Sequence, residues 1–180
     1  MAPSTLSTYA ESVMLREAVP EDWPRIYPFF AETVAAGDTY AYPEDLTSEQ
    51  AQALWMQPPP WRTIVAVEDE QVLGSAILGP NRPGRGSHVA TASFMVAPAA
   101  QGRGVGRALA GHVLELARDA GYRAMQFNAV VETNHAAVAL WQSLGFRILT
   151  TVPEAFDHPQ HGLVGLHIMH RWLPAADQAT

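Results

Sequence analysis

The chain has 180 residues, 48% of them hydrophobic, with 18 acidic against 11 basic side chains and a formal net charge of -7. This length fits one compact domain, and the acidic balance argues against a broad nucleic-acid-binding surface. The absence of cysteine excludes disulfides, thiolate zinc sites and a cysteine acyl-enzyme.

No apolar run approaches the roughly 20 residues that a membrane helix needs. The N-terminal residues carry no basic cluster followed by an apolar stretch, so they do not read as a secretion signal. These observations predict a cytoplasmic protein without membrane contact. One domain is expected over 13–173, with flexible tails at 1–12 and 174–180.

The first half of the chain predicts a strand, two helices and a β-hairpin. Thr47 or Ser48 is placed to cap the second helix, and the proline run at 58–60 ends it. The hairpin turns at 68–71, and a loop rich in Gly, Pro and Arg follows at 79–87. The expected elements are a strand at 13–18, a helical region at 20–36, a helix from 47 to 56, and hairpin strands at 62–67 and 72–78.

The second half predicts strands that alternate with two helices. After Pro98, apolar residues recur at spacings of three and four and form one helical stripe from Val105 to Ala120. The expected elements are strands at 88–96, 124–131, 147–152 and 164–172, a helix that ends at Gly121 and a helix at 134–144 that ends at Gly145. This order predicts an α/β fold with a mixed sheet and helices on both faces.

The most informative segment is the turn at 101–107, where three alternate glycines open an amphipathic helix. Exposed amides at a helix N-terminus favour a phosphate, and glycines let it approach the backbone. Arg103 and Arg107 add positive charge, although a purely structural glycine turn is the alternative. The turn fits neither a Walker loop nor a dinucleotide fingerprint, because it lacks the Gly-Lys-Ser/Thr ending of the first and the third glycine of the second.

The segment QGRGVG resembles the acetyl-CoA-binding motif of the GCN5-related N-acetyltransferase (GNAT) family: Gln or Arg, two residues, Gly, one residue, then Gly or Ala. The strand ending at 94–96 with Pro98 behind it, and the later NHAAVALWQSLGF, resemble the flanking motifs of that family. The resemblance covers 13–173. It implies an acetyl-CoA-dependent N-acyltransferase with a mixed, mostly antiparallel sheet of six to seven strands, splayed between the fourth and fifth.

The resemblance also implies where acetyl-CoA lies. The pantetheine arm is expected to pair with the strand before the turn, and the pyrophosphate to bind the amides of the turn. A plain helix N-cap would equally explain Asn134, which matches an asparagine that contacts CoA in relatives. The expected cofactor-binding residues are Phe94, Met95, Val96, Gln101, Gly102, Arg103, Gly104, Val105, Gly106, Arg107 and Asn134.

Two residues that the family often uses for proton transfer are missing. Trp141 stands where relatives have a tyrosine acid, which leaves Tyr40, Tyr42 or water to protonate the thiolate. The strand at 88–96 carries no carboxylate to serve as the base. The candidate bases are His88, Asp38 and Glu132.

Polar residues on the strand at 124–131 point to an acceptor site. Gln126 and Asn128 alternate with apolar residues, so they indicate a lined cavity or an amide that pairs with a bulged backbone. The runs MQFNAVVETN and VPEAFDHPQHG resemble the branch that acetylates proline analogues and related small amino acids. The resemblance implies catalytic roles for Asn128 and the backbone amide near Met95. The expected substrate-contacting residues are Asn128, Gln126, Thr91 and Tyr40, with Ser93 as a further hydroxyl.

The predicted function is transfer of an acetyl group to a small-molecule amine in a ternary complex. The alternatives are a non-catalytic CoA-binding or sensor domain and an N-acetyltransferase acting on a protein N-terminus or lysine. No metal is expected, because the pair His167 and His170 should face opposite sides of a strand and the pair His158 and His161 lacks a third ligand. Relatives often form homodimers, so a homodimer is considered as well.

Overall fold

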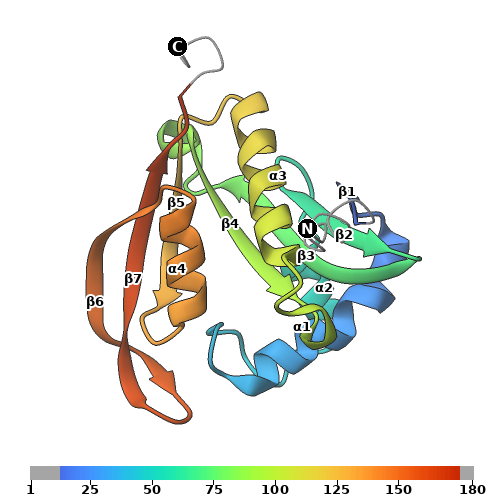
Figure 1. The fold of residues 1–180 in the computed structure, drawn as a ribbon, viewed down its shortest axis with the longest axis horizontal. Coiled ribbons are helices and arrows are strands. Elements are labelled where there is room, and N and C mark those ends of the chain that lie inside the picture. The colour runs from blue at the N-terminus through green and yellow to red at the C-terminus, as the bar shows by residue number, and fades with distance from the viewer. Residues whose placement is uncertain (1–12, 175–180) are drawn as a thin grey trace, which may run out of the picture.

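The computed structural model describes residues 13–174, so the predicted tails lie outside the described residues apart from Pro174 (Figure 1). The elements follow the predicted order, with short 3-10 turns at Pro20–Asp22, Gly84–Gly86 and Pro98–Ala100. The elements are β1 (Met14–Glu17), α1 (Trp23–Ala36), α2 (Ser48–Trp55), β2 (Arg62–Glu68), β3 (Gln71–Pro80), β4 (Val89–Val96), α3 (Val105–Asp119), β5 (Ala124–Val131), α4 (His135–Ser143), β6 (Arg147–His158) and β7 (Gly162–Trp172).

The seven strands form one sheet in the order β1-β2-β3-β4-β5-β7-β6. Neighbouring strands are antiparallel except β4 and β5, which are parallel and pair only at Val89 with Ala124 and at Ala90 with Met125. Beyond these two pairs the strands separate. The predicted mixed, mostly antiparallel sheet with a splay between its fourth and fifth strands is therefore confirmed.

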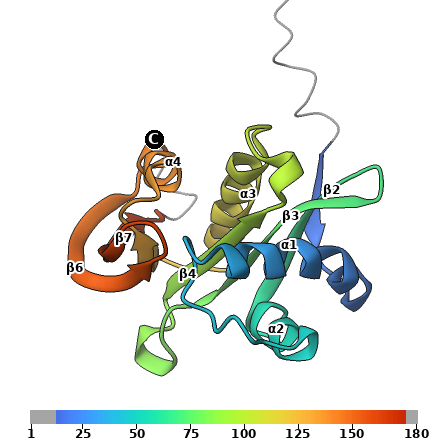
Figure 2. The same ribbon diagram turned by 90° about the horizontal axis from the view of Figure 1, so that it is seen from below.

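Helices cover both faces of the sheet, as predicted (Figure 2). On one face, α1 and α2 bury Phe30 and Trp55 against β2 and β3. On the other face, α3 buries Leu109 and Val113 against the same strands. The Trp55 Nε1 atom donates to Ser75 Oγ at 2.9 Å, which anchors α2 through a buried hydrogen bond. The two cores hold the central strands from both sides and leave the splay free to form a site.

A buried carboxylate fixes the entry of α1. Asp22 is 1% exposed, and its two oxygens accept from Arg16 Nη1 and Nη2 at 2.7 and 2.9 Å. The Val19 backbone N–H donates to the same carboxylate at 2.8 Å. The hydrogen bonds from Arg16 hold the pKa of Asp22 below its usual value, despite the opposing effect of burial.

The local stop signals are confirmed. The β2–β3 hairpin turns at Asp69 and Glu70, whose φ angles of 46° and 65° suit a two-residue turn. Gly121 ends α3 with a φ of 84°, a conformation that side chains disfavour. None of the helices within 13–174 is long and apolar enough to span a membrane.

The last hairpin is longer than predicted. The strand expected at 147–152 continues to His158, and β7 starts at Gly162 rather than Val164. Proline usually ends a strand, but β6 lies at the edge of the sheet, where Pro153 leaves no ladder hydrogen bond unmade. The pairing register shifts between Val152 and Phe156, and Glu154 takes a φ of 51° at this bulge.

Candidate functional site

The glycine-rich turn leads directly from β4 into α3. Gly104 is the N-cap of α3 and has a φ of 83°, which glycine adopts without strain. The first helical hydrogen bond there is donated by Ala108 N–H to the Gly104 carbonyl at 3.0 Å. No side chain caps this end, so the amides of the first turn stay available for a ligand.

The two arginines of the turn differ in their surroundings. Arg103 Nη2 lies 2.6 Å from Glu68 Oε2, so its charge is balanced by a carboxylate, and it does not line the adjoining cavity. Arg107 lines that cavity, and its Nη2 donates to Ser143 Oγ on α4 at 2.9 Å. Of the two arginines, Arg107 is therefore the one whose guanidinium can contact a phosphate in this cavity.

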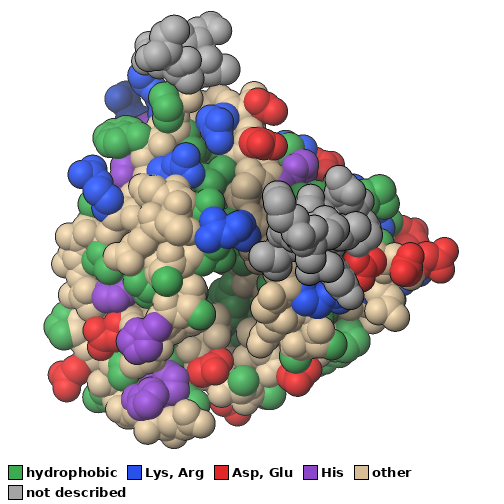
Figure 3. All heavy atoms as spheres, in the orientation of Figure 1, with side chains coloured by type: hydrophobic (Ala, Val, Ile, Leu, Met, Phe, Trp, Pro, Cys, Tyr) green, Lys and Arg blue, Asp and Glu red, His purple; other side chains and the backbone are tan. Residues whose placement is uncertain are grey.

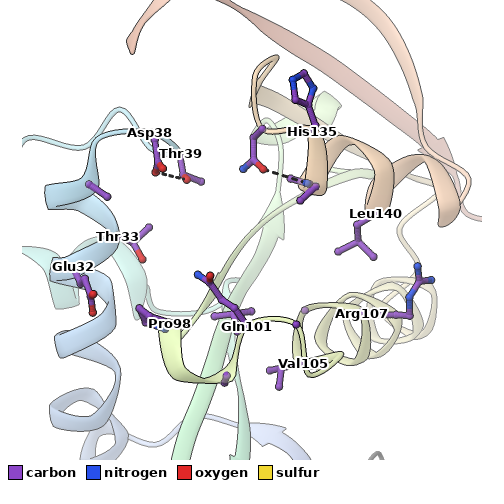
Figure 4. Close-up of a pocket in the computed structure, with 18 of the residues that line it drawn as sticks. Glu32, Thr33, Asp38, Thr39, Pro98, Gln101, Val105, Arg107, His135 and Leu140 are labelled. Carbon is purple, nitrogen blue, oxygen red and sulfur yellow. Dashed lines mark hydrogen bonds between the residues drawn. The ribbon is translucent and has the colours of Figure 1, made fainter. Parts of the chain in front are cut away.

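A cavity of about 910 Å³ lies over the turn, between α1, the start of α3 and α4. Figure 4 shows Glu32 and Thr33 of α1 on one side, Arg107 of α3 on another, and His135 at the start of α4. A hollow in the middle of the surface is visible in Figure 3. Of the predicted cofactor-binding residues, the cavity is lined by Val96, Gln101, Gly102, Gly104, Val105, Gly106, Arg107 and Asn134.

Two adjacent residues of the cavity lining, Thr133 and Asn134, present polar groups. Thr133 Oγ1 is buried without a hydrogen-bond partner among the described residues, and Thr133 lines the cavity. A buried hydroxyl without a partner is costly, so this atom suits a polar ligand group. Asn134 caps α4, because its Oδ1 accepts from Ala137 N–H at 3.2 Å, and it lines the cavity as well.

The splay exposes the backbone of β4. Ala97 N–H donates to Leu73 on the β3 side at 2.8 Å, and the Val89 carbonyl accepts from Asn81 on the same side. Backbone groups alternate along an antiparallel pair without a bulge, so Met95 also faces β3, whereas Phe94 and Val96 face the splay. The Met95 amide, predicted to polarise the reacting carbonyl, is turned away from the opening.

Tyr40, from the loop after α1, occupies part of this opening. Its hydroxyl donates to the Phe94 carbonyl at 2.6 Å and accepts from the Phe94 N–H at 2.9 Å. The side chain as a whole is only half-buried, but desolvation of the hydroxyl raises the pKa of Tyr40. The phenol thus bonds to Phe94 as a neighbouring strand would, and the backbone of Val96, on the turn side of Phe94, also faces the splay.

A second cavity, of about 370 Å³, continues from the first beyond Tyr40. The two cavities share Thr39, Asn134 and Ala137. Aromatic and aliphatic side chains from β4, β5, α4 and the last hairpin form most of its wall. It is lined by Thr39, Tyr40, Ala41, Thr91, Ala92, Ser93, Phe94, Phe127, Asn128, Ala129, Val130, Val131, Asn134, Ala137, Trp141, Phe156 and Leu166.

Asn128 lines this second cavity and belongs to a chain of three amides, whose other members, Gln126 and Asn81, do not line it. Gln126 Nε2 donates to Asn128 Oδ1 at 2.9 Å, and Asn128 Nδ2 donates to Asn81 Oδ1 at 2.6 Å. Asn128 sits where the β5–β7 pairing breaks between Phe127 and Val130, and its side chain is exposed. Asn81 was not predicted, because nothing in the β3–β4 loop sequence signals that it reaches β5.

The three candidate bases lie in different parts of the structure. Glu132 accepts a hydrogen bond from the Gly165 N–H, so it serves the β5–β7 junction. His88 lies on a different cavity, at the start of β4. Asp38 lines the first cavity, where its Oδ1 accepts from the Thr39 hydroxyl at 3.0 Å. Within 13–174 no group of three His, Asp or Glu side chains is arranged to hold a metal ion.

Comparison with known proteins places this geometry in a family. The sequence model of the Acetyltransferase (GNAT) family matches residues 17–146. A GCN5-related N-acetyltransferase from Kribbella flavida has 63% identity and a TM-score of 0.89 over 91% of this chain and 99% of that one. The N-acetyltransferase aca1 of Schizosaccharomyces pombe is 33% identical over 60% of this chain, which spans 52% of that protein's length.

A further structure illustrates cofactor binding in a relative. The structure of yncA from Salmonella typhimurium, determined with its cofactor acetyl-CoA, has 25% identity and a TM-score of 0.76. The alignment covers 93% of this chain and 99% of that one.

Proposed function

The chain belongs to the GNAT family of acetyltransferases, and on that premise we propose that it transfers an acetyl group from acetyl-CoA to the amine of a small molecule. The observation that carries this proposal is the junction of two cavities at the β4–β5 splay. One cavity lies over an uncapped helix N-terminus, and the other is lined mostly by apolar side chains.

The residues present suit acetyl-CoA. The amides at the start of α3 and the Arg107 guanidinium offer partners for the pyrophosphate, and the Thr133 hydroxyl offers a further hydrogen bond. The Val96 backbone faces the splay and would pair with the pantetheine amide, as a neighbouring strand would. Bound acetyl-CoA supplies an activated thioester. The polarising backbone amide moves from the predicted Met95 to Val96, because Met95 faces β3.

The second cavity favours a small acceptor. Its volume of about 370 Å³ falls at the lower end of the range for small-molecule sites. Phe127 and Trp141 give it an apolar wall, whereas Asn128 and Thr91 supply polar groups at its edge. A small amino acid or proline analogue, with a short apolar body and a polar end, meets both requirements.

Transfer is proposed to be direct. The acceptor nitrogen forms a bond to the acetyl carbon, the bond from carbon to sulfur breaks so that CoA leaves as its thiolate, and the amine loses one proton. Asn128 would hold the acceptor, with its amide oriented by Gln126 and Asn81. Asp38 is the candidate base that lines the cofactor cavity, so the proton would pass to it through water. Tyr40 is unsuited as the acid, because its proton is donated to Phe94 and its pKa is raised.

The test is CoA release after the protein is mixed with acetyl-CoA and a panel of proline analogues, other small amino acids and an unstructured peptide. Release that depends on one small amine supports the proposal. Release with the peptide alone indicates a protein N-acetyltransferase. Tight acetyl-CoA binding without release for any acceptor indicates a sensor domain. Asp38→Asn should lower kcat/KM, and an unchanged kcat/KM removes Asp38 as the base.

A further inference from the structure

A third cavity, of about 630 Å³, lies at the far end of α3 from the glycine-rich turn. Because α3 has 15 residues, the two ends of the helix are about 22 Å apart. The cavity lies where α3, β5 and β7 meet, and it is separate from the acetyl-transfer site. It is lined by His88, Arg118, Gly121, Tyr122, Arg123, Trp172, Leu173 and Pro174.

The charge of this cavity is opposite to that of the whole chain. The chain carries a net charge of -7, yet no carboxylate lines the cavity within the described residues, whereas Arg118 and Arg123 do. The ion pairs found within 13–174 involve other arginines, so neither guanidinium has a carboxylate partner there. Figure 3 shows several blue side chains on the β7 side of this end of the molecule, with red side chains on the other side of the end of α3.

Neighbouring cations add to this field. Arg171 lies next to the cavity residue Trp172, and burial, together with the charge of Arg118, lowers the pKa of Arg171. Cations that repel one another at close range gain from a bound anion, because it offsets their mutual repulsion.

Two aromatic rings share the cavity with the guanidinium groups. Trp172 is 65% exposed, although a large indole is usually buried in a core. Tyr122 is partly buried beside it. The backbone of Arg123 is fixed on both sides, since its N–H donates to His88 and its carbonyl accepts from Leu173, each at 2.9 Å. These two hydrogen bonds fix the backbone of the cavity wall at Arg123.

We propose that this cavity binds a nucleotide, with the phosphates held by Arg118 and Arg123 and the base stacked on the Trp172 indole. Guanidinium groups match phosphate oxygens in geometry and charge, and an exposed indole is a stacking surface for a base. The cavity volume lies within the range of small-molecule sites. This proposal does not depend on the acetyl-transfer function.

The test is titration of the whole chain with ATP, followed by calorimetry and tryptophan fluorescence, in the presence of saturating CoA to block the cofactor site. Arg118→Gln and Arg123→Gln should each weaken ATP binding about tenfold or more. Arg85→Gln removes one charge from an exposed loop, and should leave the affinity unchanged. Trp172→Leu should abolish the fluorescence response to ATP and weaken binding.

Three results would overturn the proposal. The first is the absence of ATP binding in the presence of CoA. The second is equal affinity of the Arg118→Gln, Arg123→Gln and wild-type proteins for ATP. The third is binding of inorganic pyrophosphate as tight as that of ATP, since a stacked base must add to the affinity.

Discussion

Replacing Tyr40 by phenylalanine tests how the splay is maintained. The change removes one hydroxyl and thereby two hydrogen bonds, of 2.6 and 2.9 Å, to the carbonyl and N–H of Phe94. Each buried polar group left unpaired costs about 1–3 kcal/mol, and two such groups lose their partner here, whereas water entering through the neighbouring cavity would offset part of the sum. We therefore expect a loss of about 1–3 kcal/mol in the free energy of unfolding.

Urea denaturation followed by circular dichroism measures this loss. In a domain of this size it corresponds to a fall in Tm of about 3–10 °C. The matched control is Tyr42→Phe: Tyr42 stacks on Tyr40, at 5.5 Å between ring centroids, and burial raises its pKa. No hydrogen bond of its hydroxyl is found within 13–174, so this control should change stability by less than about 0.5 kcal/mol. Equal stability of the two variants would refute the role given to the Tyr40 hydroxyl.

Three further predictions concern the site and the fold. Gly104→Ala and Gly121→Ala place a side chain at φ angles of 83° and 84°, so each should lose about 1 kcal/mol of stability, but only Gly104→Ala should weaken CoA binding in calorimetry. Equal CoA affinity of the two variants would contradict a phosphate site at the turn. Asn128→Ala should lower kcat about 100-fold with little change in CoA affinity, and wild-type turnover would remove Asn128 from the reaction. Asp22→Asn should cost about 3 kcal/mol at pH 7. Because the folded-state pKa of Asp22 is lowered, this difference is full above the unfolded pKa of about 3.9 and shrinks as the pH falls below it, which unfolding curves from pH 7 to pH 3 would measure. A constant difference would contradict the ionic role of Asp22.

Local signals predicted most of the fold. The turn at 101–107, the hairpin at 68–71 and the end of α3 at Gly121 each depend on residues within a few positions, and all three are confirmed. The extension of β6 past Pro153 was not predicted, because tolerance of proline depends on the place of the strand in the sheet.

The candidate site depends on contacts that are distant in sequence. Tyr40 bonds to Phe94 across 54 positions, and Asn128 bonds to Asn81 across 47. The sequence predicts Tyr40 and Asn128 as substrate residues, but no local pattern indicates their partners. The direction of the Met95 amide follows from the β3–β4 register, which no local pattern fixes.

The bulge in β6 also bears on how copies of this chain meet. An edge strand of 12 residues offers a row of unpaired backbone groups to any other strand, and β6 exposes Leu149 and Val152 beside that row. Pro153 lacks an N–H, and the backbone turns at Glu154, so the row is interrupted near its middle. A second strand can therefore pair with only a short part of β6. This disfavours the edge-to-edge association of copies of the chain that leads to aggregation.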